Sequence, residues 1–320
     1  IVHGVVSLDQ LRTEFGGDRR RIRVTKMRGR PFHSGFHDYE IETGGVNVFP
    51  RLVAADHRRD FETGVLHSGL PAMDTLLGGG IDRGTSTLFL GAAGTGKSSL
   101  AMHFVIQAAR RGEHSAVFLF EESVHALRTR SRGLGLDLDA RIADGTVMVQ
   151  PVDPSELSPG EFFHIVREAV ERRQARIVVI DSLNGYLNAM PGERFLITQL
   201  HELLSYLGQM GVASFLLNAQ QGLIGSMSST LDVSYLADTV VLLRYFEANA
   251  EMHTAISVLK KRTGAHERSL RELVISSEGI DIGEPLRSFH GVLTGVPQEI
   301  GQPAIHAAAG PRLQKLDVAP

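Results

Sequence analysis

The sequence contains no cysteine, so it can form neither a disulfide framework nor a thiolate metal site. This absence fits a reducing compartment, and the cytoplasm is the expected location. Long hydrophobic runs are also absent: the apolar runs, such as those at residues 177–180 and 240–243, are far shorter than the ~20 residues that span a bilayer. No signal-peptide pattern opens the chain. The sequence therefore predicts a soluble protein without a membrane partner.

An excess of charge of one sign is lacking as well. The 320 residues include 33 Lys and Arg and 36 Asp and Glu, spread along the chain, and the formal net charge is −3. Without a basic field, nucleic acid is an unlikely partner on electrostatic grounds. Because 42% of the residues are apolar, the chain can bury a core of ordinary size, as one large domain or two small ones.

A short stretch of sequence recurs at the spacing of a whole domain. Residues 22–29 (IRVTKMRG) are echoed by residues 256–264 (ISVLKKRTG), and residues 45–48 (GVNV) by residues 279–282 (GIDI), each 234 positions later. We interpret residues 1–53 as the last strands of a preceding, truncated domain, which should pack poorly without its body. Chance similarity of short, basic, β-rich stretches is the alternative.

The rest of the chain divides by composition. Residues 54–67 carry several charges with little periodicity, which indicates a linker. Residues 68–290 form one complete domain, and residues 291–320 are rich in Ala, Pro, Gly and Gln without a sustained apolar face, which predicts a disordered tail.

Strands and helices alternate along the complete domain, which predicts the α/β class with a mostly parallel central sheet. Antiparallel strands follow near the C-terminus. Ser158, Pro159 and Glu161 form a capping box that starts one helix. Ligand should bind at the carboxyl ends of the parallel strands. The predicted strands cover residues 85–90, 115–120, 147–152, 176–181, 212–218, 239–244, 253–260 and 270–275, and the longest helices cover residues 98–111 and 193–210.

Residues 91–98 (GAAGTGKS) match the pattern G-x-x-x-x-G-K-[ST], with a predicted strand before and a predicted helix after. The glycines let backbone N–H groups wrap phosphates, Lys97 bridges the β- and γ-phosphates, and Ser98 ligates Mg²⁺. ATP and Mg²⁺ are therefore the predicted ligand and cofactor. A glycine-rich turn without nucleotide is the alternative. The predicted nucleotide-binding residues are Gly91, Gly94, Thr95, Gly96, Lys97, Ser98, Ser99 and Asp181.

Acidic residues follow two of the predicted strands. Asp181 ends a buried β-branched strand, as a Mg²⁺-holding Walker B acid does, although Asp is also a common turn former. Glu121 and Glu122 end the second strand, where neighbouring side chains point to opposite faces, so only one of them should polarise the attacking water. Alternatively, both merely place negative charge at the start of the next helix.

Lys260 and Arg262 alternate on a late strand and should point to one side. Such a pair can stabilise γ-phosphate charge, from its own subunit or a neighbour's, while a solvated basic face is the alternative. The 14 histidines form neither an H-x-x-x-H pair nor a matched cluster, so no metal beyond nucleotide-bound Mg²⁺ is predicted.

Together with residues 69–80 (GLPAMDTLLGGG), these motifs resemble the KaiC family of RecA-like P-loop ATPases over nearly all of residues 1–290. The resemblance implies a homo-oligomer, a hexamer with ATP between subunits, and two ATPase repeats, of which this chain matches the second and the end of the first. It implies that Lys260 and Arg262 reach a neighbour's ATP and that Glu121 or Glu122 is the base. Lys26 and Arg28 would have served the first repeat's site.

The resemblance also implies serine autokinase activity, because that family phosphorylates a Ser-Thr pair that here reads Ser234-Tyr235. Ser234 is the predicted phosphoacceptor. Tyr235 holds its hydroxyl too far out to replace threonine, which argues against a two-site cycle. Residues 226–230 (SMSST) supply other hydroxyls, and the alternative is that this segment is only a mobile loop. The family's regulatory tail is not recognisable in residues 297–320, although regulatory protein partners are compatible with the family.

Three functions compete on this basis. The first is an oligomeric ATPase with serine autokinase capacity, in signalling or circadian-type regulation. The second is a RecA/RadA-like DNA-dependent ATPase, which is disfavoured because residues 222–234 contain no Lys or Arg for phosphate contacts. The third is a nucleotide-gated assembly switch with negligible turnover.

Overall fold

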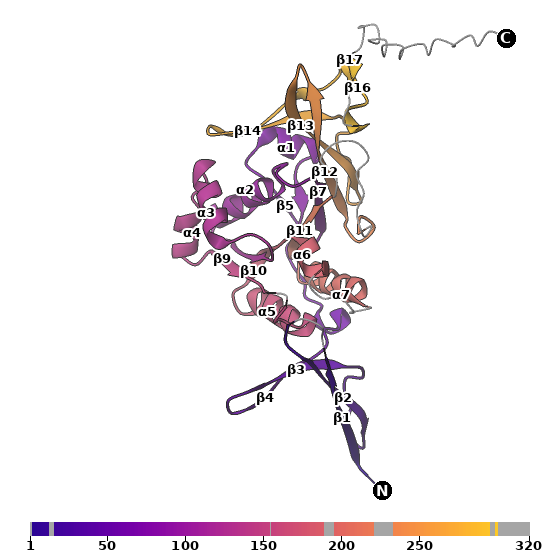
Figure 1. Ribbon diagram of the computed structural model, residues 1–320. Helices are drawn as coiled ribbons and strands as arrows, with labels where there is room; N and C mark the ends of the chain where they lie inside the picture. The colour runs from indigo at the N-terminus through magenta and orange to yellow at the C-terminus, as the bar shows by residue number, and fades with distance from the viewer. Residues whose placement is uncertain are drawn as a thin grey trace, which may run out of the picture.

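The computed structural model describes residues 2–12, 16–153, 155–188, 195–220, 233–294 and 298–299. These residues form a nine-stranded sheet flanked by helices and, at the N-terminal end, a separate four-stranded sheet (Figure 1). Two two-stranded sheets complete the described part of the chain.

Parallel strands form the centre of the large sheet. Its order is β15-β14-β13-β12-β7-β11-β10-β8-β9, and β12 through β9 all pair in parallel. The chain then turns back through antiparallel strands, so the expected mixture of pairings is confirmed. The strands are β7 (Ser86–Gly91), β8 (His114–Leu119), β9 (Val147–Pro151), β10 (Ala175–Asp181), β11 (Ala213–Ala219), β12 (Thr239–Ala248), β13 (Glu251–Lys261), β14 (Arg271–Ser276) and β15 (Gly279–Pro285).

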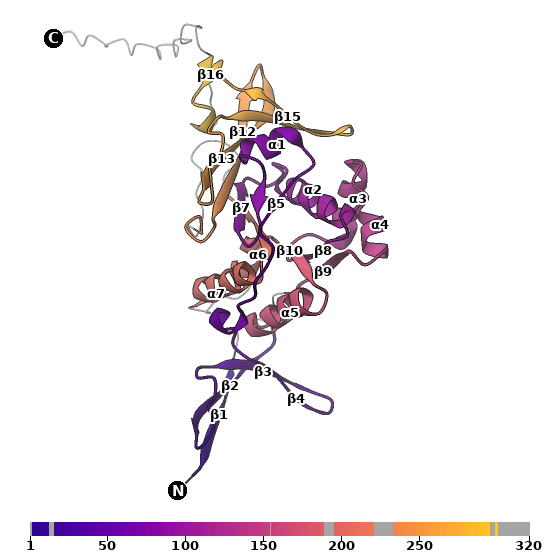
Figure 2. The same ribbon diagram turned by 180° about the vertical axis from the view of Figure 1, so that it is seen from behind.

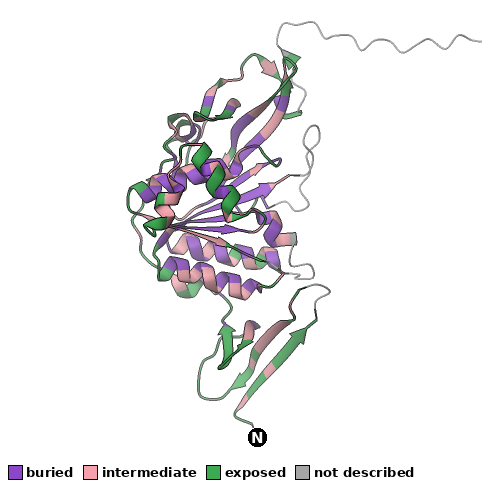
Figure 3. Cartoon of the chain, turned by 60° about the vertical axis from the view of Figure 1, so that its left-hand side comes forward, coloured by how far each residue is buried: buried purple, intermediate pink, exposed green. Residues whose placement is uncertain are grey.

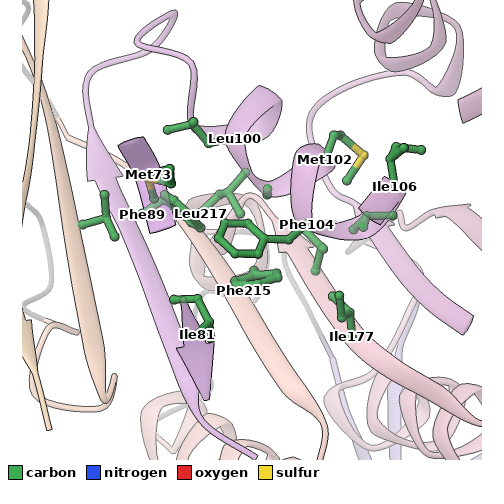
Figure 4. Close-up of a cluster of buried hydrophobic side chains, with 14 of the residues drawn as sticks. Met73, Ile81, Phe89, Leu100, Met102, Phe104, Ile106, Ile177, Phe215 and Leu217 are labelled. Carbon is green, nitrogen blue, oxygen red and sulfur yellow. The ribbon is translucent and has the colours of Figure 1, made fainter. Parts of the chain in front are cut away.

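Helices cover both faces of this sheet, and each face has its own core (Figure 3). Successive strand residues point to opposite faces, so Phe89 joins one core and its neighbour Leu88 joins the other. In the first core Phe89 and Phe104 pack on Phe215 (Figure 4). The first core is covered by α1 (Pro71–Leu76), α2 (Lys97–Arg110), α3 (Val124–Gly133) and α4 (Leu138–Ala143), and the second by α5 (Pro159–Glu171), α6 (Leu183–Asn188) and α7 (Leu196–Gln209).

The capping signals at α5 are confirmed. The Glu161 N–H donates to Ser158 Oγ at 3.1 Å, and the Glu161 carboxyl receives the Ser158 N–H. Pro159 occupies the first helical position, where its missing N–H costs nothing. Local chemistry therefore sets the start of this helix.

Some predicted boundaries are wrong by a few residues. The second strand ends at Leu119 rather than residue 120, and α7 starts at Leu196 rather than residue 193, with residues 189–194 outside the described part. The predicted disorder from residue 291 is also wrong at its start. Val292 in η2 (Val292–Thr294) is buried against Phe246, and β17 (Gln298–Glu299) pairs with β16 (Phe289–His290). Residues 300–320 lie outside the described residues.

The residues predicted to form a linker pack on the large domain. η1 (Ala54–His57) lies beside α7, where the Ala54 N–H donates to Glu202 at 3.3 Å. Phe61 lies against Gly211, and a Cβ on this glycine would come within 2.3 Å of the Phe61 ring. The segment ends in β5 (Val65–Leu66), which pairs with β6 (Ile81–Asp82). In the described part of the chain, no helix combines the length and apolar character of a membrane span.

The N-terminal sheet repeats the C-terminal strands in order and register. Its strands are β1 (Gly4–Leu11), β2 (Arg19–Met27), β3 (His37–Glu42) and β4 (Gly45–Phe49). The pairs Arg21–Asp38 and Glu40–Asn47 correspond, 234 positions later, to Ala255–Glu272 and Val274–Asp281. For β1 and β12 the offset is 235, since Leu8 pairs with Ile22 and Leu243 with Ile256, and the irregularity between Val5 and Val6 then corresponds to the one between Val240 and Val241.

One face of the N-terminal sheet lacks the cover that its counterpart has. Leu8, which pairs with Ile22, is 63% exposed, whereas Leu243, which pairs with Ile256 in the C-terminal sheet, is fully buried. Val46 is 57% exposed, whereas Ile280 is 9% exposed and packs in the first core. The two sheets therefore share a strand pattern but differ in what covers their apolar face.

Candidate nucleotide site

The glycine-rich loop lies between β7 and α2, as the motif predicts. Gly96 is the N-cap of α2 with φ 96°, a left-handed conformation that favours glycine, and a Cβ there would meet Ile275 at 2.3 Å. Thr95 Oγ1 closes the loop by donating to the Ala92 carbonyl at 2.9 Å, and Ser99 is buried in α2. The loop thus directs backbone N–H groups and a helix N-terminus to one place, which suits phosphate.

Lys97 is the buried cation of this loop. Its side chain is 8% exposed, and Nζ donates to the carbonyls of Gly91 at 2.9 Å and Ala92 at 2.7 Å. Burial lowers the pKa of Lys97 to about 8, while the charges of Asp181 and Glu121 act in the opposite direction. A negative phosphate beside Lys97 would therefore stabilise its charged form.

Ser98 and Asp181 meet across the carboxyl edge of the sheet. Asp181 ends β10, which is separated from β7 by β11 alone, and the Ser98 hydroxyl donates to its carboxylate. Burial raises the pKa of Asp181, whereas the Ser98 hydrogen bond lowers it. No group of three potential metal-ligating His, Asp or Glu residues occurs in the described part of the chain. Two oxygen ligands suit Mg²⁺, which takes its remaining ligands from phosphates and water.

Glu121 and Glu122 are in the loop after β8, so the prediction that they end a strand with opposite faces is wrong. The two glutamates differ instead in the side chains that they contact. Glu121 Oε2 accepts from Ser182 Oγ at 2.6 Å. Glu122 forms a two-pronged ion pair with Arg130 of α3, with Arg130 Nη2 at 2.8 Å from Oε2. Glu121 faces the Lys97 charge, and Glu122 faces Asp181.

Sequence reasoning did not identify Ser182 and Arg130 as site residues. Ser182 is buried and directly follows Asp181. Its position next to the predicted Walker B acid is the sequence feature that could have identified it as a site residue. Arg130 lies two turns into α3, the helix that the sequence predicts after the two glutamates, but its polar sequence gave no reason to single out this arginine. The contact between its guanidinium and Glu122 becomes visible only in the folded structure.

Lys260 and Arg262 point to one side of β13, as predicted from their alternation. Lys260 Nζ donates to the carbonyls of Ser234 at 3.1 Å and Ala237 at 2.7 Å, and Arg262 Nη2 donates to the Tyr235 carbonyl at 2.9 Å. On the opposite side, the intervening lysine donates to carbonyls of the loop after α1. Ser234 is half-buried, and the Tyr235 side chain is 55% exposed. Residues 226–230 lie outside the described residues.

This basic pair is remote from its own glycine-rich loop. In the parallel register of β12 and β7, Thr239 pairs with Thr87 at the start of β7, whereas Leu243 pairs with Gly91 at its end. Arg262 is level with the start, because its N–H donates to the Asp238 carbonyl. At ~3.3 Å per strand residue, the pair and the loop are separated by more than about 10 Å along the sheet, in addition to the lateral offset.

Comparison with known proteins shows the family to which the chain belongs. Residues 66–287 match the family model "ATPase: KaiC". The chain belongs to the KaiC ATPase family. The KaiC match spans α1 to β15 and so includes the glycine-rich loop, both glutamates, Asp181 and the basic pair. The RecA-like fold expected from the resemblance is therefore established.

Circadian clock oscillator proteins named KaiC are among the relatives. The one from Parasynechococcus marenigrum is 28% identical over 91% of this chain and 57% of its own length. Those from Prochlorococcus marinus strain MIT 9313 and Synechococcus elongatus are 30% and 28% identical, over 88% and 91% of this chain. The chain spans only a little over half the length of these KaiC proteins, about 56% of each of the latter two.

Proposed function

We propose that this KaiC-family domain binds Mg·ATP and hydrolyses it between subunits of a homo-oligomer. The observation that carries the proposal is the hydrogen bond from Ser98 to Asp181 beside the buried Lys97, because this arrangement unites the three groups that a P-loop site needs. Lys97 and the loop N–H groups hold the phosphates. Ser98 and Asp181 hold Mg²⁺, which supplies neutralisation of the phosphate charge.

Glu121 is the better candidate for the general base. Arg130 donates to both carboxylate oxygens of Glu122, so a guanidinium already engages this carboxylate. Ser182 donates to a single oxygen of Glu121, which orients that carboxylate beside Lys97. In this proposal Glu121 accepts the proton of the attacking water, and the Glu122–Arg130 pair positions the loop.

Lys260 and Arg262 are proposed to stabilise the γ-phosphate of a neighbouring subunit. Their distance from their own glycine-rich loop supports this assignment, since a lysine side chain reaches only about 6 Å. The family resemblance favours a hexamer, in which each subunit gives its basic edge to the next. The clock function in the relatives' names suggests signalling or circadian-type regulation for this chain.

Serine autokinase activity at Ser234 is the second part of the proposal. Lys260 and Arg262 hold the carbonyls of Ser234 and Tyr235, so a nucleotide brought to the basic pair also comes near Ser234. In the transfer, Ser234 Oγ attacks the γ-phosphorus, the bond to the bridging β–γ oxygen breaks, and ADP leaves. The hydroxyl proton passes to Glu121 of the subunit that holds the nucleotide.

The N-terminal sheet is proposed to be the closing strands of another ATPase repeat. The shared order, register and 234-residue offset support common origin with β12 to β15. Its exposed apolar face is the one that a helical body covers in the C-terminal copy.

Incubation with Mg·ATP, with ADP release and intact mass followed together, tests the chemistry. We expect ADP release that Lys97→Ala abolishes, and mass gain in steps of one phosphate that Ser234→Ala also abolishes. ADP release without mass gain would remove the kinase proposal and leave the ATPase. Tight binding of single-stranded DNA at modest salt, with DNA-stimulated turnover, would favour the DNA-dependent ATPase instead.

Mixing two inactive variants tests the arrangement between subunits. A Lys97→Ala subunit lacks a working loop, and a Lys260→Ala subunit lacks the basic pair. In a randomly mixed 1:1 ring, about one quarter of the interfaces join an intact loop to an intact lysine, so activity should return to that level. If both groups act within one subunit, mixing restores nothing and the proposal fails.

A further inference from the structure

The first turn of α5 contacts the N-terminal sheet on the face opposite its exposed apolar side. The Gly160 N–H donates to Asp38 Oδ2 of β3 at 2.8 Å, and Asp38 also pairs with Arg21 of β2 at 3.5 Å. One turn earlier, the Gly17 N–H donates to the Ser155 carbonyl at 3.4 Å. Both views of the ribbon show β3 beside α5 (Figures 1 and 2). Beside these polar contacts, Phe49 of β4 is buried against His164 of α5, with ring centroids 5.5 Å apart.

Gly160 permits the close approach of helix and sheet. A Cβ at this position would lie 2.7 Å from Asp38 Oδ2 and 3.1 Å from Asp38 Cβ, so a larger residue would displace the carboxylate that joins the helix to the sheet. Asp38 thereby adds a carboxylate to the N-terminus of α5, where negative charge is favourable. The fit depends on glycine at 160 and an acid at 38.

Two further carboxyl groups meet inside the joint. Glu161 of α5 and Glu40 of β3 are within hydrogen-bonding contact, and Glu161 Oε2 is buried without a partner among the described residues. Two carboxyl groups can form a hydrogen bond only when one of them carries a proton. The charged or titratable groups around them are Arg19 and Arg21 on β2, Asp38 on β3, His164 on α5, and Asp153 and Glu156 in the preceding turn.

We propose that a proton shared by Glu40 and Glu161 holds the N-terminal sheet on α5, so that this joint loosens as the pH rises through neutrality. With the proton the pair is a hydrogen bond; without it, two half-buried carboxylates repel each other. The proposal concerns contacts within the chain and does not depend on ATP hydrolysis.

The direction follows from proton linkage. Burial and then the neighbouring Glu40 charge raise the pKa of Glu161 from its ordinary 4.5 to about 7 in the docked arrangement. Because the docked form holds its proton more tightly, docking is favoured below pH 7 and weakens as the pH rises through that value. With these two values, the docking equilibrium constant falls about tenfold between pH 6 and pH 8.

Spin labels measure the docking directly, because the absence of native cysteine makes labelling specific. Thr43→Cys at the β3–β4 turn and Arg172→Cys at the end of α5 place one label on each side of the joint in the full chain. We expect the fraction at the docked distance to fall from pH 6 to pH 8. Adding Gly160→Ala should give the undocked distance at both pH values. An unchanged distribution in the parent pair contradicts the proposal.

Neutral substitutions identify the responsible group. Glu161→Gln should remain docked at both pH values, whereas the exposed Glu42→Gln on the same strand should keep the parent pH response. A carboxyl ¹³C titration should place the Glu161 midpoint near 7 in the parent chain and near 4.5 in Gly160→Ala. A parent midpoint near 4.5, or a full pH response in Glu161→Gln, overturns the proposal.

Discussion

Raising the pH should weaken nucleotide binding through Lys97. Its ammonium is buried, its contacts are two loop carbonyls, and burial lowers its pKa to about 8, below the ordinary 10.5. Phosphates placed beside it favour the charged form and should return its pKa to at least the ordinary value. Binding must therefore take up a proton above pH 8.

The size of the effect follows from the two pKa values. With 8 for the protein alone and 10.5 in the complex, the apparent affinity falls about tenfold between pH 7 and pH 9. About 0.9 proton is taken up per nucleotide at pH 9 by the same linkage. Lys97 also makes the free energy of unfolding depend on pH. The unfolded chain binds the Lys97 proton more tightly than the folded chain, so the free energy of unfolding increases as the pH rises from 8 to 10.5.

Titration calorimetry with Mg·ADP in two buffers of different ionisation enthalpy measures both quantities. Lys97→Arg provides the control, because a guanidinium keeps its charge through this range and should bind without the pH response, although more weakly. Equal affinity at pH 7 and pH 9, no proton uptake at pH 9, or the same pH response in Lys97→Arg would refute the reasoning.

Three substitutions test the remaining assignments. Glu121→Gln should lower the rate of ADP release at least 100-fold and Glu122→Gln less than tenfold, because only the first substitution removes the base. Steady-state ATPase assays measure both rates, and a larger loss in Glu122→Gln contradicts the assignment. Ser182→Ala, which removes one hydrogen bond from Glu121, should lower kcat roughly fivefold with KM unchanged, and a rise in KM alone would speak against a positioning role. Ser158→Ala should lower the free energy of unfolding by ~1 kcal/mol in denaturant titrations, and no change would show that the cap is dispensable.

The parallel core could be predicted because the sequence signals for its strands and helices lie within a few neighbouring residues. Strand β10 is buried on both faces and reads as a continuous β-branched run, and the capping box of α5 lies within four residues. The hairpin between β12 and β13 is longer than predicted because its turn gives no such signal. Asn249 and Ala250 both take positive φ, and Ala is an unusual residue for that conformation.

The division of labour between the two glutamates could not be predicted, because it depends on distant partners. Ser182 is 61 positions from Glu121 in the sequence and reaches it only because β8 and β10 are adjacent in the sheet. Arg130 belongs to α3, whose sequence VHALRTRSRG is too polar to show an apolar stripe. Alternation along a strand could not distinguish the two glutamates, because both lie in the loop after β8.

The separation of the glycine-rich loop from the basic pair constrains the symmetry of any assembly that uses both. In a two-fold interface, residue i of one subunit contacts residue j of its partner and residue j contacts residue i, so a closed dimer can complete both sites only if the loop and the basic pair lie in one shared patch. If they lie on different surfaces, the contact is heterologous, and each subunit contributes the loop at one surface and the basic pair at another. Such a contact ends in a ring if its rotation closes and in a filament if it does not, and every open end would carry one incomplete site.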